Sequence, residues 1–185
     1  MEFSINRDIF LKSLSHAHGI IEKKTTLPIL SNILIDAKDS KIRITATDLD
    51  IIYSEEILVQ DLQKEGSTTT SASILYDILR KLESNTKVEI SLQSSNKLKL
   101  VSGNSKFNLL CVSSDNFPLL DEDIKKKNLE VSSKKLLKLL NKTKISISND
   151  ETRHYLNGIY LHITNFENKK LLTGVATDSH RLSSS

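Results

Sequence analysis

The chain has 185 residues, of which 38% are hydrophobic, so it is not disordered throughout and can form one domain or one and a fraction. A single cysteine, Cys111, excludes an internal disulfide framework, and no segment resembles a signal peptide or reaches the length of a membrane span, so we expect a soluble cytoplasmic protein with Cys111 in its core. The formal net charge of +3 is too small to indicate nucleic-acid binding by itself, because many ordinary enzymes are as basic.

The chain opens with a short strand from Phe3, followed by an amphipathic helix from about Arg7 to Gly19. Asn6 is the expected N-cap of this helix, because an asparagine side chain can accept hydrogen bonds from the first-turn N–H groups. The expected apolar stripe of the helix consists of Ile9, Phe10, Leu14 and Ala17.

Alternating apolar and polar residues follow Pro28. Residues 33–35 and 42–46 alternate on either side of a turn-prone stretch at 36–40, which predicts an antiparallel hairpin. The same order of a strand, a helix and further strands begins again at residues 68–70. A helix is expected near Ser73 to Leu82, and three alternating segments follow it. Those segments contain Val88, Ile90 and Leu92, then Leu98 and Leu100, then Phe107 and Leu109.

A domain boundary is expected after this second set of strands. Residues 121–128 are strongly charged and show no apolar alternation, so we place a linker there. The linker separates a first domain at 1–120 from a second domain at 129–185, which we expect to be incomplete.

The second domain repeats motifs of the first. Residues 129–137 match residues 3–11, which predicts a further strand and a helix from about Ser132 to Lys142. Two further motifs of the first domain recur in the same order. Leu156 to Leu161 resembles Leu30 to Ile35, and Ala176-Thr177-Asp178 repeats Ala46-Thr47-Asp48. The sequence therefore predicts a duplicated unit of one helix plus antiparallel strands, in a pseudo-symmetric α+β fold.

The helix that begins near Ser132 has two contrasting faces. Its basic face carries Lys134, Lys135, Lys138 and Lys142, and its apolar face carries Leu136, Leu137 and Leu140. Such a helix can pack under a sheet and present cations to a phosphate backbone without reading bases. The two earlier helices carry Arg7 and Lys12 beside Asp8, and Arg80 and Lys81 beside Asp77, so their basic bias is weaker and an ordinary solvated surface remains open for them.

Five segments, taken together, resemble the bacterial DNA sliding clamps, the beta subunits of DNA polymerase III. The segments are Thr26-Leu27-Pro28-Ile29-Leu30-Ser31-Asn32, Thr47-Asp48-Leu49, Asp115-Asn116-Phe117-Pro118, Tyr155-Leu156-Asn157-Gly158 and Ala176-Thr177-Asp178-Ser179-His180-Arg181-Leu182. The resemblance implies a DNA-clamp fold, in which helices line the inner face of a ring. It also implies a noncatalytic protein with no cofactor and no metal. Three similar domains per protomer would close head to tail, as a homodimer, around duplex DNA.

The resemblance also implies DNA contacts. Lys24 occupies the position of a basic residue that touches DNA in the family, and His154 and Tyr155 match an aromatic pair with the same role. Tyr155 could equally be a core ring whose hydroxyl is satisfied. Two positions depart from the pattern, because Ser73 stands where the family has a basic residue and Asp150 is an acid where the family can have an amide.

A second implied site is a groove for short peptides of partner proteins. The family's partners are the polymerase catalytic subunit, the clamp loader, and repair and translesion polymerases. The matching groove residues are Leu156, Thr177, His180, Arg181 and Leu182, with Ser179 in place of the family's usual glycine. Phe107 and Leu109 match the first-domain edge that forms the ring interface, although any buried strand shows the same alternation.

Two other functions remain open. Asp178, His180 and the serines at 183–185 contain the ingredients of a hydrolytic site, but no nucleophile elbow, glycine-rich phosphate loop or metal-ligand spacing accompanies them. Asp48 with Asp50 is as readily a turn as a metal site. A peptide-binding scaffold without a DNA role is the third reading.

Overall fold

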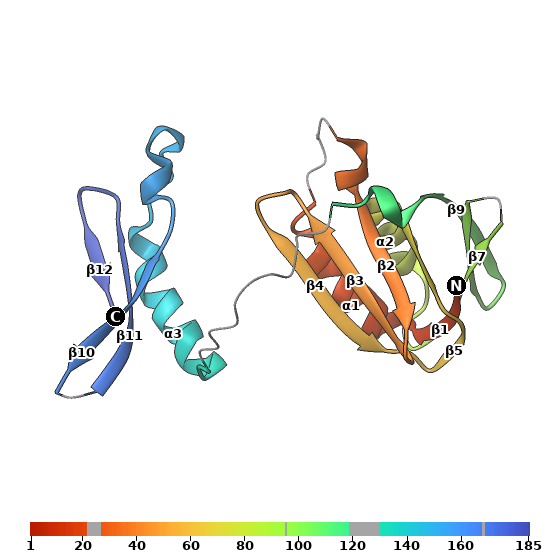
Figure 1. The fold of residues 1–185 in the computed structure, drawn as a ribbon, viewed down its shortest axis with the longest axis horizontal. Coiled ribbons are helices and arrows are strands. Elements are labelled where there is room, and N and C mark those ends of the chain that lie inside the picture. Colours follow the sequence, from red (N-terminus) through yellow and green to blue (C-terminus); the bar gives the residue numbers. More distant parts are fainter. Residues whose placement is uncertain (22–26, 95, 119–129, 168) are drawn as a thin grey trace. The chain divides into compact units, whose positions relative to one another are not determined.

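A computed structural model describes residues 1–21, 27–94, 96–118, 130–167 and 169–185. The chain divides into two compact units, Met1–Glu122 and Asp123–Ser185 (Figure 1). Within the described residues, no helix is both long and apolar enough to cross a membrane.

The first unit is built on a nine-stranded sheet in which every pairing is antiparallel. The order across the sheet is β4-β3-β2-β6-β9-β8-β7-β1-β5. The strands are β1 (Glu2–Asn6), β2 (Asn32–Lys38), β3 (Lys41–Thr47), β4 (Ile52–Leu58), β5 (Asp61–Lys64), β6 (Gly66–Ser71), β7 (Lys87–Gln93), β8 (Lys97–Ser102) and β9 (Ser105–Val112). The strand before each helix pairs with the strand after the other helix, β1 with β7 and β6 with β2, so two similar halves form one sheet.

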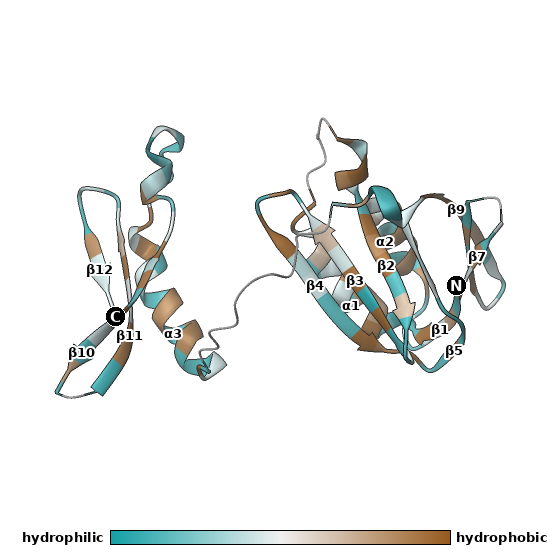
Figure 2. Ribbon diagram, in the orientation of Figure 1, coloured by the Kyte–Doolittle hydropathy of each residue, from teal (hydrophilic) through white to brown (hydrophobic). Residues whose placement is uncertain are grey.

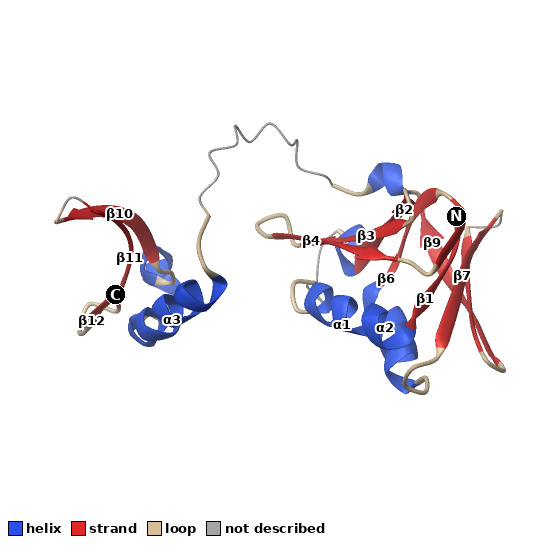
Figure 3. Cartoon of the chain, turned by 90° about the horizontal axis from the view of Figure 1, so that it is seen from below, coloured by secondary structure: helices blue, strands red, loops and turns tan. Residues whose placement is uncertain are grey.

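Helices α1 (Arg7–His18) and α2 (Ala72–Lys81) lie side by side on one face of this sheet (Figure 3). The predicted N-cap is confirmed, because the Asn6 side chain accepts from Asp8 N at 2.9 Å and from Ile9 N at 3.4 Å. Phe10, Leu14 and Ala17 are buried, as expected. Ile9 is 51% exposed, so its assignment to the apolar stripe was wrong: the i, i+4, i+7 positions face the sheet, and Ile9 precedes them by one residue.

The predicted hairpin is confirmed, with a tighter turn than expected. Strands β2 and β3 pair from Leu34↔Thr45 to Lys38↔Lys41. Only Asp39 and Ser40 are left to turn the chain, and both have positive φ, 50° and 60°. Apolar residues of this hairpin and of the neighbouring strands form the core beneath α1 and α2 (Figure 2).

Strands β4 and β5 were not predicted. They lie at the two edges of the sheet and carry mostly polar or exposed residues. An edge strand buries less of its surface than a central strand, so its sequence shows weak alternation. Short 3-10 helices complete this unit at Pro28–Ser31 (η1) and Ser114–Asn116 (η2).

The second unit packs one helix, α3 (Ser133–Thr143), against a three-stranded antiparallel sheet. Its strands are β10 (Tyr160–Phe166), β11 (Lys169–Thr177) and β12 (Leu182–Ser184), and its 3-10 helices are η3 (Lys144–Ser146) and η4 (Glu151–Leu156). Glu130 to Ser132 form no strand, so within the described residues the strand expected before this helix is absent.

The prediction for the apolar face of α3 was wrong at one residue. Leu137 is 59% exposed, whereas Leu139 packs so closely on β11 that a Cβ added to Gly174 would lie 2.5 Å from Leu139 Cδ2. Leu136 and Leu140 are half-buried, as expected. The stripe that packs on the sheet is therefore centred on Leu139, which is half-buried and lies against Gly174, where the missing side chain leaves room for it.

Candidate functional site

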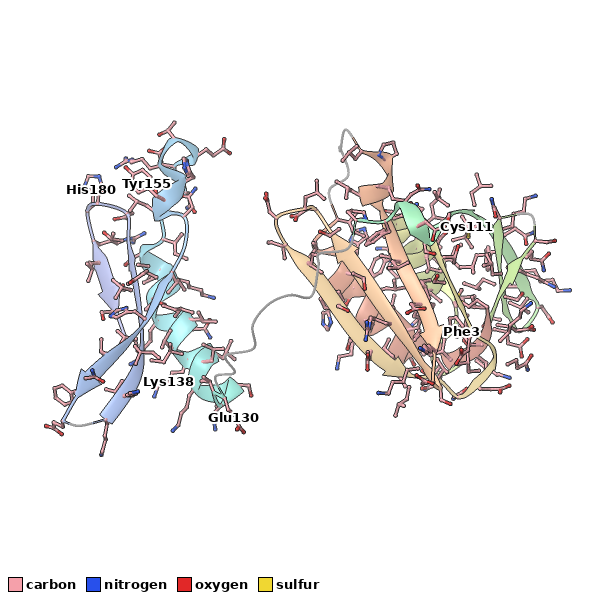
Figure 4. The ribbon with its side chains drawn as sticks, viewed as in Figure 1. Phe3, Cys111, Glu130, Lys138, Tyr155 and His180 are labelled. Carbon is pink, nitrogen blue, oxygen red and sulfur yellow. The ribbon has the colours of Figure 1, made fainter. Side chains whose placement is uncertain are left out.

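The basic face of α3 is open to solvent in the second unit. Lys134, Lys135 and Lys138 are all exposed, and none of them forms an ion pair with another described residue (Figure 4 labels Lys138). The opposite side of α3 packs on β11 and β12. One face of α3 thus presents three lysines that form no ion pair within the described residues, and the other face packs on the sheet through apolar side chains.

The predicted aromatic pair, His154 and Tyr155, lies on η4 in the second unit. The His154 and Tyr155 rings meet edge to face, with centroids 6.1 Å apart at 78°. Tyr155 is 74% exposed, so it is not a core ring of this unit. Both rings are therefore available to a ligand.

Asp150 fixes the start of η4. Its carboxylate accepts from the Thr152 backbone at 3.0 Å, from the Thr152 hydroxyl at 2.6 Å and from Arg153 Nε at 2.9 Å. Thr152 first, and then Arg153, lower the pKa of Asp150 to about 2. The acid at this position is thus engaged locally, and Arg153 balances its charge.

The segment from Thr177 to Leu182 begins with a hydrogen-bonded turn. Asp178 Oδ1 accepts from His180 N at 3.0 Å and from Arg181 N at 2.9 Å, and these backbone bonds lower the pKa of Asp178. Thr177 Oγ1 accepts from Ser179 N at 3.2 Å and donates to Arg181 O at 2.7 Å. Ser179 has φ 78°, in the left-handed region that favours glycine.

The same turn occurs in the first unit. Thr47 Oγ1 accepts from Leu49 N at 3.0 Å and donates to Ile51 O at 2.9 Å, and Asp48 Oδ1 accepts from Asp50 N at 3.0 Å and Ile51 N at 2.7 Å. Leu49 has φ 81°. The repeated Thr-Asp motif therefore specifies one backbone geometry twice, and Asp48 is a turn residue.

A pocket of about 310 Å³ opens beside the second turn. It is lined by Tyr155, Leu156, Gly158, Ile159, Tyr160, Val175, Ala176 and Thr177. Two of the predicted groove residues, Leu156 and Thr177, meet in it. Ile159, Tyr160 and Val175, which also line the pocket, were not among the residues predicted from the sequence. Tyr160 and Val175 lie on β10 and β11, where they face each other across the strand pair.

The other predicted groove residues lie in or after the adjoining turn and do not line this pocket. His180 and Arg181 are exposed, and Leu182 is 66% exposed. Arg153 Nη1 donates to Ser179 Oγ at 3.2 Å, which joins η4 to the turn, and Figure 4 shows Tyr155 and His180 at the same end of this unit. The Ser179 side chain thus points to Arg153, outside the pocket lining.

Strand β9, which contains the predicted interface residues, has a partly open edge. It pairs with β8 from Ser105 to Leu110, but with β6 only through Cys111 and Val112. Cys111 N donates to Asn96 O at 2.9 Å, so the alternating N–H and C=O groups of Lys106 and Asn108 point away from β8 and have no strand partner among the described residues.

The side chains of β9 divide between core and solvent. Leu109 is 5% exposed and belongs to the core, Phe107 packs against that core, and Leu110 is 79% exposed. The buried Leu109 side chain can support an interface only by holding the strand edge in place.

Two other predicted positions have different outcomes. Lys24 lies outside the described residues. Ser73, on α2, places Oγ 3.5 Å from His18 Nε2.

The ingredients of a hydrolytic site are not assembled. The Asp178 carboxylate is used by its own turn and by Arg181 Nε at 2.9 Å, and Ser183 Oγ lies 2.6 Å from Ser146 Oγ. Over the described ranges, no hydrogen bond links the His180 ring to either group, and no three His, Cys, Asp or Glu side chains are grouped to hold a metal ion.

Two family matches together cover most of the chain. Residues 1–121 match the DNA polymerase III beta subunit N-terminal domain, and residues 130–185 match the central domain of the same subunit. The beta sliding clamp of Caulobacter vibrioides is 38% identical over 184 residues, covering 99% of this chain and 49% of the relative. The Pseudomonas aeruginosa clamp is 32% identical over 183 residues, covering 99% and 48%. The chain thus spans about half the length of these curated relatives.

Solved structures agree with these matches. The Caulobacter crescentus beta sliding clamp, with PEG bound to a putative beta-motif tethering region, is similar with a TM-score of 0.94 and 37% identity, covering 100% of this chain and 49% of that one. The Bartonella birtlesii sliding clamp bound to griselimycin is similar with a TM-score of 0.87 and 38% identity, again covering 100% and 49%.

Proposed function

The chain belongs to the DNA polymerase III beta subunit family, and from this membership we propose that it serves in a DNA sliding clamp. In this role it is noncatalytic. The clamp encircles duplex DNA as a head-to-tail homodimer and tethers the replicative polymerase for processive synthesis. The clamp loader and the repair and translesion polymerases dock on the same protein.

The observation that carries the DNA role is the lysine face of α3. Three exposed lysines without acidic partners among the described residues can neutralise phosphates, and the leucines opposite them anchor the helix to the sheet. Phosphate contact carries no sequence information, so a ring that makes it can slide. His154 and Tyr155 add an exposed aromatic contact to the same unit.

Neutralising this face tests the proposal. In the Lys134→Gln, Lys135→Gln, Lys138→Gln triple variant, we expect weaker binding to a 20-base-pair duplex. The slope of log affinity against log salt should fall by up to about 3, because each phosphate contact contributes about 0.9. Lys169→Gln with Lys170→Gln, which removes exposed lysines of β11, is the control. An equal loss of affinity per lysine in the control would show that only the total charge matters. The hypothesis of a peptide-binding scaffold without a DNA role would then be favoured.

We propose that the pocket at Leu156 and Thr177 is part of the partner-peptide groove, with Ser179, His180, Arg181 and Leu182 on the turn that borders it. Apolar walls from Leu156, Ile159 and Val175 fit the side chain of a docked peptide, and the exposed His180 and Arg181 supply polar contacts. The griselimycin bound to the Bartonella birtlesii relative makes that compound a suitable test ligand.

Calorimetric titration of griselimycin tests the groove. We expect the Leu156→Ala variant to bind about tenfold more weakly, a loss of about 1.4 kcal/mol. Leu171→Ala, an exposed leucine of β11 outside the pocket, is the matched control. Equal griselimycin affinities of Leu156→Ala and wild type would show that the pocket is not part of the groove.

We propose that the open edge of β9 is the first-unit side of the ring interface. Two observations support it: the outward backbone groups of Lys106 and Asn108 have no strand partner in the described part of the chain, and the Leu110 side chain is exposed. Phe107 and Leu109 hold this edge from the core side.

A further inference from the structure

A small polar pocket lies on the face of the first sheet that points away from α1 and α2. It has a volume of about 180 Å³ and is bordered by residues of β5, β1, β7 and β8. Along β1, Phe3 and Ile5 enter the core, so Glu2 and Ser4 project from the opposite face. The pairings of β1 with β7 and of β7 with β8 continue this alternation across the neighbouring strands.

The pocket forms where short side chains are surrounded by long ones. Ser4 and Ser91 are among its lining residues, and neither side chain is long enough to fill the space above its strand. Glu2 lies directly opposite Ser91 on β7, and Ser91 lies directly opposite Lys99 on β8. The long side chains that line the pocket are those of Glu2, Gln63, Lys87, Glu89 and Lys99.

The hydroxyl of Ser4 is the feature that points to a ligand. Ser4 is 4% exposed, and its Oγ is buried without a hydrogen-bond partner in the described part of the chain. Every residue that pairs with β1 on either side is described, so the adjoining strands supply no partner. A buried hydroxyl without a hydrogen bond is unfavourable, and a solute that binds to it in the pocket removes that cost.

The charged side chains indicate the chemistry of this solute. Lys87 and Glu89 form an ion pair at 3.1 Å, so each balances the charge of the other. Glu2 and Lys99 lie on strands two apart, which places their backbones about 10 Å from each other, with Ser91 between them. A solute in this space meets a carboxylate on one side and an ammonium on the other. A molecule that carries both an ammonium and a carboxylate matches the two sides.

We propose that this pocket binds a small zwitterion of the α-amino acid class. The ammonium of the ligand donates to the Glu2 carboxylate, and the carboxylate of the ligand accepts from the Lys99 ammonium and the Ser4 hydroxyl. The volume of about 180 Å³ admits an amino acid with a short side chain. The site belongs to the first unit, whereas the lysine face of α3 and the pocket at Leu156 belong to the second, so it is a function beyond DNA binding and partner docking.

NMR titrations of the nitrogen-15-labelled 185-residue chain with glycine, acetate and methylammonium test this site at neutral pH and fixed ionic strength. With glycine we expect saturable shifts of the Ser4 and Ser91 amide resonances at millimolar concentrations. Acetate and methylammonium should each bind about two- to fivefold more weakly, because each makes only one of the two charged contacts. Glu2→Gln and Lys99→Gln should weaken glycine binding by the same factor.

Ser4→Ala separates a ligand contact from a structural role. Without ligand this variant should unfold at the same urea concentration as wild type or a higher one, because it loses an unpaired hydroxyl and no hydrogen bond. Its response to glycine should nevertheless be weaker. A less stable Ser4→Ala variant would reveal a partner for the hydroxyl within the protein and would overturn the inference.

Lys106→Gln is the matched control for the charge substitutions. Lys106 lies opposite Val101 on the same face of the sheet but outside the pocket, so this variant should bind glycine as wild type does. Equal glycine affinities of wild type and Lys99→Gln would overturn the proposal, as would small shifts spread over the chain without saturation. Acetate binding as tight as glycine binding would also overturn it, because the site would then select an anion.

Discussion

At the scale of single residues, two positions carry a backbone conformation that their side chains disfavour. Leu49 and Ser179 have φ 81° and 78° because the Thr-Asp turn closes its hydrogen bonds only around a left-handed residue. The cost of that conformation for a residue with a Cβ is about 1–2 kcal/mol. At Ser179 a hydrogen bond to Arg153 partly offsets it.

Substitutions at Ser179 should follow this backbone requirement. Ser179→Gly relieves the strain but adds chain entropy, so we expect stability within about 0.5 kcal/mol of wild type. Ser179→Val, with a branched Cβ, should lose about 1–2 kcal/mol in urea denaturation. Leu49→Gly is the paired substitution in the first unit. A Ser179→Val variant as stable as Ser179→Gly would contradict the assigned turn.

A second prediction at the scale of single residues concerns the pKa of Asp150. The folded state lowers it from 3.8 to about 2, so the stability that Asp150 contributes is present above pH 3.8 and is lost as pH falls through about 2. A carboxyl titration followed by NMR should show a midpoint near 2. Thr152→Val should raise the midpoint toward 3.8 more than Arg153→Ala, because Thr152 is the larger cause. The reverse order would count against this network.

At the scale of elements, Arg7 joins the two helices of the first unit. It is 8% exposed, and its guanidinium donates to Leu79 O at 2.6 Å and to Arg80 O at 2.8 Å, two carbonyls in the last turn of α2. A cation at a helix C-terminus also complements the helix dipole. Sequence reasoning placed Arg7 on the solvent face of α1 beside Asp8. The ion pair with Asp8, at 2.7 Å, does form, but the rest of the side chain caps α2.

Removing this cap should destabilise the first unit. We expect Arg7→Met to lose about 2–3 kcal/mol, because the carbonyls of Leu79 and Arg80 lose a charged donor and the first of these hydrogen bonds is buried. Arg7→Lys should lose less, since an ammonium can still serve one carbonyl. Lys12→Met, at an exposed position of the same helix, should change stability by less than about 0.5 kcal/mol. The measurement is urea denaturation followed by circular dichroism, and equal effects of Arg7→Met and Lys12→Met would refute the cap.

At the scale of the whole molecule, a net charge of +3 conceals a separation of charge between the units. The second unit holds twice as many basic as acidic residues, while the first has an acidic excess. Electrostatic attraction to DNA should therefore be concentrated in the second unit at neutral pH.

An NMR titration can map that difference. At pH 7.5, low salt and increasing duplex DNA, we expect shifts of backbone resonances first in α3 and around His154 and Tyr155. Shifts in α1 and α2 should be smaller. Larger shifts at α1 and α2 than at α3 at pH 7.5 would contradict this distribution.

Much of the fold follows from the sequence. The periodicity of residues 7–19 and 73–82, the Asn6 cap and the alternation at 33–46 and 88–109 are local signals, and each gave the observed element. The repeated Thr-Asp motif did so as well, because its hydrogen bonds lie within five residues. The resemblance to the family rests on such local motifs.

Other features were decided only by tertiary structure. Arg7 became a cap and Leu139 replaced Leu137 in the buried stripe because distant segments supply their partners, Leu79 O for one and Gly174 for the other. The pocket wall formed by Tyr160 and Val175, and the stacking of His18 on Tyr76, likewise depend on which strands and helices meet. Sequence determines what a segment can bury or bond locally, whereas the contacts between segments depend on how the completed sheet brings them together.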